Sequence, residues 1–88
     1  MELEKKAEII SKLVQQWLLN NKKNECKPDD VIQFLKDNGV YSMNSINAKS
    51  LRGDLRKLHE RNQMDLIRGL YFKQPNKNRL WFFKRVDV

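Results

Sequence analysis

Residues 45–62, with the sequence SINAKSLRGDLRKLHERN, constrain this chain more than any other segment. Read as a helix, the segment places its apolar side chains on one face, at steps of three and four residues. These are Ala48, Leu51, Leu55 and Leu58. The opposite face carries basic residues and one glycine: Lys49, Gly53, Arg56 and Lys57. One face is therefore suited to a protein core and the other to an anion.

Asn44 or Ser45 is the expected N-cap of this helix, because a short side-chain oxygen can accept a hydrogen bond from the unpaired first-turn amides. Gly53 falls in the middle of the polar face, where a glycine costs about 1 kcal/mol relative to alanine. Two interpretations of Gly53 stay open. It is a tolerated surface residue, or its missing side chain lets another molecule approach the helix backbone closely.

The length of 88 residues predicts one domain, residues 1–88, with a single small core. A hydrophobic fraction of 40% beside 33% charged residues, with regular apolar spacing, argues against disorder. The longest apolar run, residues 80–83, is far too short to span a membrane, and the N-terminus lacks the apolar core of a signal peptide. We therefore expect no membrane partner and an intracellular location: cytoplasmic, nucleoid-associated or, in a eukaryote, nuclear. The lone Cys26 agrees with a reducing compartment.

The net charge of +7 is unevenly distributed along the chain. Residues 1–44 carry seven basic and seven acidic side chains, which cancel. Residues 45–88 carry eleven basic and four acidic side chains, so the whole excess lies on the amphipathic helix and the segment after it. Such a concentration of positive charge is typical of a surface that binds a polyanion. The alternative is a basic surface that serves only solubility.

Residues 2–20 predict a first helix, with an apolar stripe along one side and acidic residues near the positive end of the helix dipole. The stripe consists of Leu3, Ala7, Ile10, Val14 and Trp17, and is widened by Ile9, Leu13 and Leu18. Most of this stripe should enter the core, while its breadth leaves open a homodimer contact through this helix. Residues 20–24 lack apolar periodicity and should end the helix.

Residues 25–27 are expected to form a very short strand. Cys26 in it should be a small buried residue, since the chain has neither a second cysteine nor a histidine cluster for a metal site. A second helix should begin around Pro28, which suits a first helical turn, and end where Gly39 suits a left-handed cap. The link over residues 40–44 is short. The second helix, this link and the basic helix therefore form a helix-turn-helix arrangement.

After residue 62 the spacing changes from helical to strand-like. Residues 66–73 and 79–86 are rich in aromatic and branched side chains, and the turn-forming residues 74–78 lie between them. We expect a β-hairpin with a basic tip. Five of the eight aromatic residues lie in it, and apolar residues occupy both faces of each strand, so the pattern does not fix the register. Most of these aromatics should be core, with Tyr71 or Trp81 partly exposed.

This order of elements resembles the winged helix-turn-helix domain over almost the whole chain, from residue 3 to residue 86. The resemblance rests on element order and charge placement, since the chain carries no family-specific motif. It implies an α+β fold: a three-helix helix-turn-helix core followed by a C-terminal β-hairpin wing. In winged-helix proteins the third helix typically enters the DNA major groove, and the wing touches the neighbouring backbone or minor groove. Carried onto this sequence, the resemblance implicates Ser45, Asn47, Lys49, Ser50, Arg52, Gly53, Arg56, Lys57, Lys73, Asn76, Lys77, Asn78 and Arg79.

The residue types of the third helix favour DNA binding independently of the resemblance. Arginine can bind guanine through two parallel hydrogen bonds and asparagine can bind adenine in the same way, whereas lysine mostly neutralises phosphate. Arg52, Arg56 and Asn47 are therefore candidates for base reading. Candidates for phosphate contacts are Lys49, Lys57, Lys77 and Arg79. Asp54 and Glu60 are expected to pair with neighbours on the same helix, for example Asp54 with Lys57 or Glu60 with Arg56.

The sequence argues against an enzyme and against a bound cofactor or metal. It holds one histidine, His59, and no glycine-rich phosphate loop, metal-ligand spacing or carboxylate pair. His59 lies beside the apolar stripe and should pack or form a hydrogen bond. The leading function is binding of double-stranded DNA, as a small transcriptional regulator or DNA-associated accessory protein. Two alternatives stay open: a winged-helix module that binds a protein partner, and RNA binding, which exposed aromatics would favour.

Overall fold

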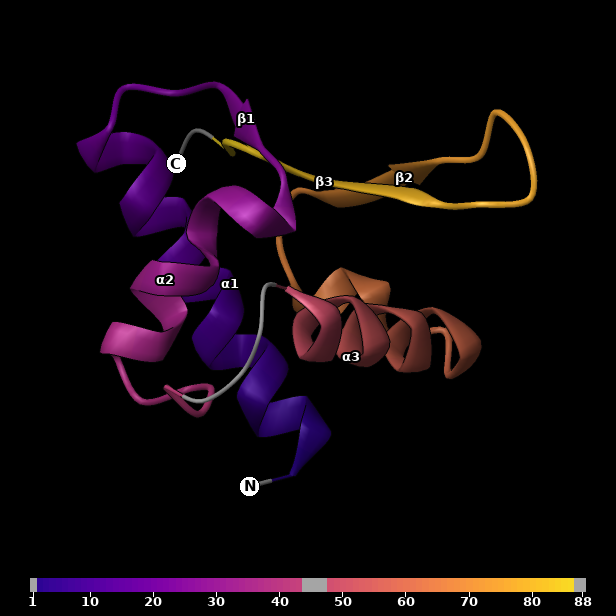
Figure 1. The fold of residues 1–88 in the computed structure, drawn as a ribbon, viewed down its shortest axis with the longest axis horizontal. Helices are drawn as coiled ribbons and strands as arrows, with labels where there is room; N and C mark the ends of the chain where they lie inside the picture. Colours follow the sequence, from indigo (N-terminus) through magenta and orange to yellow (C-terminus); the bar gives the residue numbers. More distant parts are fainter. Residues whose placement is uncertain (1, 44–47, 87–88) are drawn as a thin grey trace.

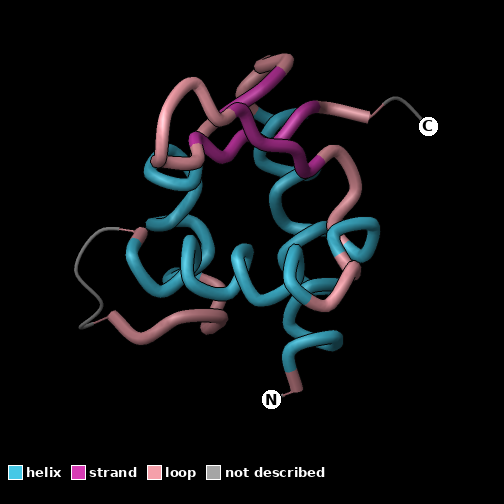
Figure 2. The backbone as a smooth tube through the Cα atoms, turned by 90° about the vertical axis from the view of Figure 1, so that its right-hand side faces the viewer, coloured by secondary structure: helices cyan, strands magenta, loops and turns pink. Residues whose placement is uncertain are grey.

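The computed structural model describes residues 2–43 and 48–86. In these ranges three helices pack beneath a three-stranded antiparallel sheet, so the chain has the predicted α+β class (Figures 1 and 2). No helix in the same ranges is long and apolar enough to cross a membrane. In chain order the elements are α1 (Leu3–Asn20), β1 (Glu25–Cys26), α2 (Pro28–Asp37), α3 (Lys49–Glu60), the short 3-10 helix η1 (Met64–Leu66), β2 (Leu70–Lys73) and β3 (Leu80–Lys84).

The two N-terminal helices have the boundaries that the sequence predicted. α2 begins at Pro28, and Asp30 closes its first turn by accepting a hydrogen bond from the Lys27 amide at 2.9 Å. Gly39 follows the last turn with a φ of +77°, in the left-handed region that favours glycine. The apolar residues buried along α1 recur at steps of three and four: Ala7, Ile10, Val14 and Leu18.

α3 buries the face that the periodicity predicted, and three of its apolar side chains, together with Ala48 just before it, form the centre of the core. The helix starts later than the predicted residue 45, because Lys49 is its first residue and Ala48 is the residue before it. Ala48 has no side-chain oxygen that could cap the first turn. The predicted N-caps Asn44 and Ser45 lie outside the described residues. The core residues at 0% exposure are Ala48, Leu51, Leu55 and Leu58.

β3 is the central strand of the sheet. It pairs antiparallel with β2 in the hairpin and antiparallel with β1 on its other side. The pairing with β1 places Cys26 opposite Phe83, and both side chains are buried, as expected for the cysteine. Trp81 and Phe83 face the core, at 7% and 0% exposure, whereas Phe82 between them is only partly buried. The structure thus fixes the strand faces that the sequence left open.

The hairpin strands are shorter than predicted. η1 occupies part of the expected first strand, and the chain turns before β2 begins at Leu70. Gly69 makes this turn with a φ of +83°, and a Cβ atom there would overlap the carbonyl oxygen of Lys84. Only glycine fits such a close approach of two backbone segments. The second strand covers residues 80–84 and not 79–86.

One side chain of α1 holds the base of the hairpin. The Nε2 atom of Gln15 donates hydrogen bonds to the carbonyl oxygens of Arg68 and Lys84, at 3.0 and 2.9 Å. The Oε1 atom of Gln15 accepts a hydrogen bond from the amide of Val86 at 2.9 Å. The chain is therefore fastened to α1 where it enters the hairpin and where it leaves, while the loop at residues 74–79 extends away from α1 and α2 (Figure 1).

Candidate nucleic-acid interface

A groove of about 530 Å³ lies between α3 and the hairpin loop, residues 74–79. It brings together side chains that are far apart in the sequence. Five of the predicted site residues line it, and Gln74 is an addition that the sequence analysis did not single out. We call this surface the α3–loop groove; its lining residues are Arg52, Arg56, Gln74, Lys77, Asn78, Arg79 and Trp81. Three arginines and a lysine in one groove favour binding of an anion.

Arg52 forms an ion pair at the edge of the α3–loop groove. Its Nη2 atom donates a hydrogen bond to Oδ1 of Asp29, in the first turn of α2, at 2.7 Å. Both side chains are exposed, at 40% for Arg52 and 57% for Asp29. Asp29 lies in the first turn of α2, and no sequence pattern pointed to its contact with α3, so it is a site feature that was not predicted.

Arg56 and the basic loop residues differ in the contacts that their side chains make with the rest of the protein. Arg56 is exposed and makes no ion pair within the described part of the chain, so the expected pair with Glu60 is wrong. Lys77 is also exposed. By contrast, the guanidinium carbon of Arg79 lies 5.4 Å from the centre of the Phe72 ring, a cation–π contact.

Arg79 also has a buried Nε atom that lacks a hydrogen-bond partner among the described residues. Its guanidinium is therefore supported by an aromatic ring and keeps an unused donor. Elsewhere in the loop, the Asn76 side chain accepts a hydrogen bond from the Asn78 amide at 2.8 Å, which shapes the turn. Lys73, at the end of β2, lies over the Phe82 ring on the outer side of the sheet, 5.3 Å from its centre.

A second groove, of about 610 Å³, lies on the other side of α3. Four predicted site residues line it, together with the chain between α2 and α3 and one lysine of α1. Gly53 borders this groove, and a Cβ atom there would meet nothing within 4 Å. No packing within the described residues therefore requires a glycine at this position. The full lining is Lys6, Val40, Tyr41, Ser42, Lys49, Ser50, Gly53, Asp54 and Lys57.

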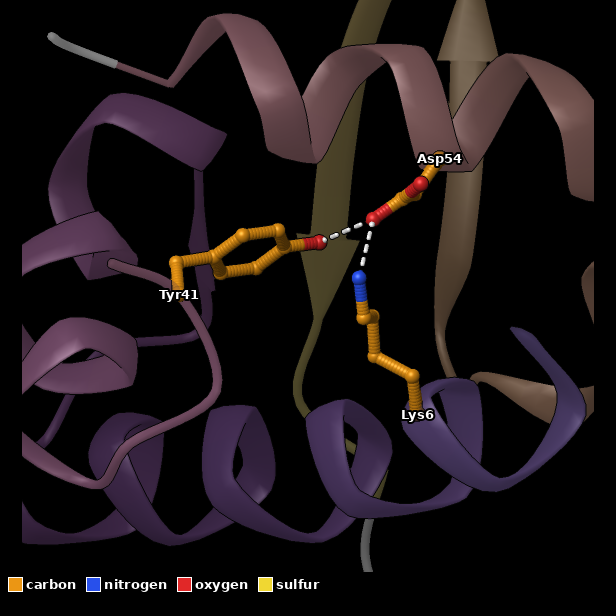
Figure 3. Close-up of polar contacts among 3 residues, drawn as sticks. All are labelled: Lys6, Tyr41 and Asp54. Atoms are coloured by element: carbon orange, nitrogen blue, oxygen red, sulfur yellow. Dashed lines mark hydrogen bonds and ion pairs between the residues drawn. The ribbon is translucent and has the colours of Figure 1, made fainter. Parts of the chain in front are cut away.

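Asp54, the acidic residue in this second groove, is hydrogen-bonded by other side chains of the protein (Figure 3). The carboxylate of Asp54 accepts hydrogen bonds from the Tyr41 hydroxyl at 2.7 Å and from the Lys6 ammonium at 3.2 Å. The predicted pairing of Asp54 with Lys57 is therefore wrong. Burial, followed by the hydrogen bond to Asp54, raises the pKa of Tyr41 well above its ordinary value. We call these three side chains the Asp54 network.

Three other aromatic or reactive side chains, those of Tyr71, His59 and Cys26, are engaged within the fold. Tyr71 is partly exposed, as expected of it or Trp81, and its hydroxyl donates a hydrogen bond to Glu25 at 2.5 Å. His59 contacts the sulfur of Met64 at 3.3 Å and the Phe72 ring at 5.0 Å between centroids, which fits the expected packing role. Burial raises the pKa of the Cys26 thiol to about 12, which disfavours the reactive thiolate form in the folded chain.

Two predicted site residues, Ser45 and Asn47, lie outside the described residues. Within residues 2–43 and 48–86, no three or more His, Cys, Asp and Glu side chains are grouped so as to hold a metal ion. Comparison of the chain with models of protein families, with curated proteins and with solved structures found no match. The case for any function therefore rests on the geometry and charge of this chain.

Proposed function

We propose that this chain is a winged helix-turn-helix domain that binds double-stranded DNA through α3 and the hairpin loop. The observation that carries the proposal is the α3–loop groove. It unites cations from a helix and from a loop more than twenty residues away in the sequence, and the uncompensated charge of the chain lies in the same region. A helix that presents arginines beside a basic loop suits major-groove entry with a flanking backbone contact.

The arrangement of elements supports the same proposal. Three helices precede a β-hairpin, the third helix follows a short link after the second, and a two-residue strand completes the sheet. This is the element order of winged-helix domains. α3 leaves one face to solvent, because its other face fills the core. The exposed face carries Lys49, Arg56 and Lys57 around Gly53.

Charge distribution favours duplex DNA over an unpaired strand. Proteins that bind single strands stack bases on open aromatic rings. Here Phe82 is already stacked on Tyr71, with centroids 5.3 Å apart, and is covered in part by Lys73. Trp81 and Phe83 are buried. Four cations line the α3–loop groove, while Lys73 lies over Phe82 on the outer side of the sheet.

A protein partner is the second candidate, and one observation favours it. Leu80 is 49% exposed on the outer side of the sheet, next to the partly exposed Phe82. These side chains offer a small apolar patch of the kind found in protein interfaces.

An NMR titration with a mixed-sequence duplex, compared with single-stranded DNA and RNA, tests the proposal. We expect amide shifts in α3 and the hairpin loop with the duplex. The logarithm of affinity should fall against the logarithm of salt concentration with a slope of roughly −4 to −5, if about four to six cations neutralise phosphates. Affinity that barely changes with salt would refute polyanion binding. Shifts confined to the outer side of the sheet, with a single strand, would favour RNA or unpaired DNA.

A further inference from the structure

We infer that Asp29 is a positioning residue: it orients the guanidinium of Arg52 for reading a base edge. This inference rests on the proposed DNA binding and concerns how the same site selects a sequence. Arg52 leaves α3 and reaches the first turn of α2, where Asp29 accepts one of its N–H bonds at 2.7 Å. Its guanidinium is thereby held at a defined place on the wall of the α3–loop groove.

The hydrogen-bonding capacity of Arg52 leaves room for a ligand. A guanidinium carries five N–H donors in a planar fork, and the bond from Nη2 to Asp29 uses one of them. The other donors stay available for the two parallel hydrogen bonds by which arginine recognises guanine. Such readout demands a fixed orientation, because a mobile arginine neutralises phosphate as readily as it reads a base.

The fold explains Asp29 only in part: in the first turn of α2 its carboxylate interacts favourably with the helix dipole, which contributes modestly to stability. An ion pair this exposed contributes little to stability. The first turn of α2 is closed by the neighbouring Asp30, whose carboxylate accepts the Lys27 amide. Asp29 is therefore not the residue that caps the helix.

For a surface that binds a polyanion, a carboxylate at the rim is a disadvantage, because it cancels one cation and repels phosphate. A residue that weakens general DNA attraction and adds little stability is accounted for if it provides selectivity. Arg56, on the same helix face, has no ion-pair partner among the described residues. The two arginines therefore differ: the Arg52 guanidinium has a partner on α2 that can fix its orientation, and the Arg56 guanidinium has none among the described residues.

The test selects preferred duplexes for the wild-type protein from a library with a randomised centre. Affinities are then measured for the selected duplex and for a scrambled duplex of the same composition. The ratio of the two affinities is the readout, since a change in overall charge moves both affinities together. Asp29→Ala should lower this ratio by about 5- to 100-fold, the loss expected for one two-pronged base contact. Its affinity for the scrambled duplex should stay the same or rise.

Four further variants isolate orientation from charge and from folding. Asp29→Asn keeps an oxygen that can accept the Arg52 bond, so its ratio should fall less than that of Asp29→Ala. Asp65→Ala removes an exposed negative charge in η1, away from the groove lining, and should leave the ratio unchanged. Adding Asp29→Ala to Arg52→Ala should lower the ratio no further, because the two residues act as one unit. Melting curves should show all five variants folded.

The outcomes separate this inference from the proposed function. If Asp29→Ala keeps the wild-type ratio, Asp29 does not position a reading residue. The same holds if Asp29→Ala lowers the ratio as much in the Arg52→Ala background as in the wild-type protein. If the wild-type protein binds duplexes but selects no sequence, the positioning role is refuted while DNA binding stands. If it binds no duplex, both are refuted.

Discussion

The two sides of α3 use their acidic partners in different ways. On the side toward α1, Asp54 is bound by Tyr41 and Lys6, and the side chains of the Lys6–Asp54 pair are only 24% and 15% exposed. On the side toward the hairpin loop, Asp29 meets Arg52 in an ion pair that is 40% to 57% exposed. The charges of Asp54 and Lys6 are paired with each other inside the protein, whereas most cations near the Asp29–Arg52 pair remain open to a ligand.

The difference indicates that burial separates charges that stabilise the fold from charges that stay open for the proposed binding. A mostly buried carboxylate with two donors is costly to leave unpaired, so the Asp54 network fastens α1 and the link after α2 to α3. An exposed ion pair contributes little to the free energy of folding, and it can instead orient a side chain such as Arg52. The following substitutions test this division, from the largest expected effect to the smallest.

Leu55→Ala sets the scale, because it removes a fully buried side chain from the core face of α3. We expect a loss of about 2–5 kcal/mol in the free energy of unfolding, measured by chemical denaturation. Arg56→Ala, the next position on the same helix, should change stability by no more than about 0.5 kcal/mol while it weakens binding to DNA. Greater sensitivity to Arg56 than to Leu55 would contradict the orientation of α3.

Asp54→Ala should destabilise the fold by about 1–3 kcal/mol, because Tyr41 and Lys6 lose their acceptor in mostly buried surroundings. Asp29→Ala should cost no more than about 1 kcal/mol. In a domain of this size each kcal/mol lowers the melting temperature by about 4–8 °C, so calorimetry resolves the two. Equal effects would remove the proposed distinction between the two carboxylates.

Alkaline pH gives an independent measure of the Asp54 network. The pKa of Tyr41 is raised in the folded chain, so its neutral hydroxyl stabilises the fold below the ordinary tyrosine pKa of about 10. This stabilisation is lost as the pH rises above about 10. Tyr41→Phe should reduce the loss, which unfolding curves between neutral and alkaline pH would show.

The double substitution Lys77→Ala and Arg79→Ala should weaken DNA binding about equally across unrelated sequences. It should reduce the magnitude of the salt slope by up to about two units, if both cations contact phosphate. Lys12→Ala with Lys23→Ala removes the same charge from exposed positions outside both grooves and serves as the control. If the loop variant binds every duplex as well as the wild type, the loop is not a DNA contact, and the outer side of the sheet should be tested against protein partners.

Gly53→Ala should act on stability and binding in opposite directions. Alanine favours a helix interior over glycine by about 1 kcal/mol, and the added Cβ meets no atom within 4 Å, so the melting temperature should rise. Binding to duplex DNA should weaken if the helix backbone lies close to the ligand. Unchanged affinity would identify Gly53 as a tolerated surface residue.

Local signals in the sequence predicted most of the elements. Apolar periodicity marked the buried faces of α1 and α3, and Pro28 and Gly39 marked the ends of α2, because each of these effects acts within one or two turns. The turn-forming residues between the hairpin strands did the same for the loop. Five residues of the α3–loop groove were also predicted, since charge and element order are visible along the chain.

Contacts between distant segments could not be predicted in this way. Asp54 pairs with Lys6, 48 positions away in the sequence, and Arg52 pairs with Asp29, 23 positions away. Neither pairing produces a periodic pattern in the sequence. Helix geometry alone predicts that Asp54 pairs with a neighbour on the same helix. In the structure its carboxylate is bound instead by Tyr41 and Lys6, in more buried surroundings. Gly69 is a similar case, because the need for glycine comes from Lys84, on the other strand.

The bonds of Gln15 have a consequence for how this domain can change. They fasten both roots of the hairpin to α1, while Asn76 and Asn78 in the loop hydrogen-bond to each other. The loop can therefore be lengthened or shortened between these fixed roots without disturbing the helices, since surface insertions have a small entropic cost. Reach and charge of the loop are thus free to vary independently of the core, and one scaffold can carry loops suited to different ligands.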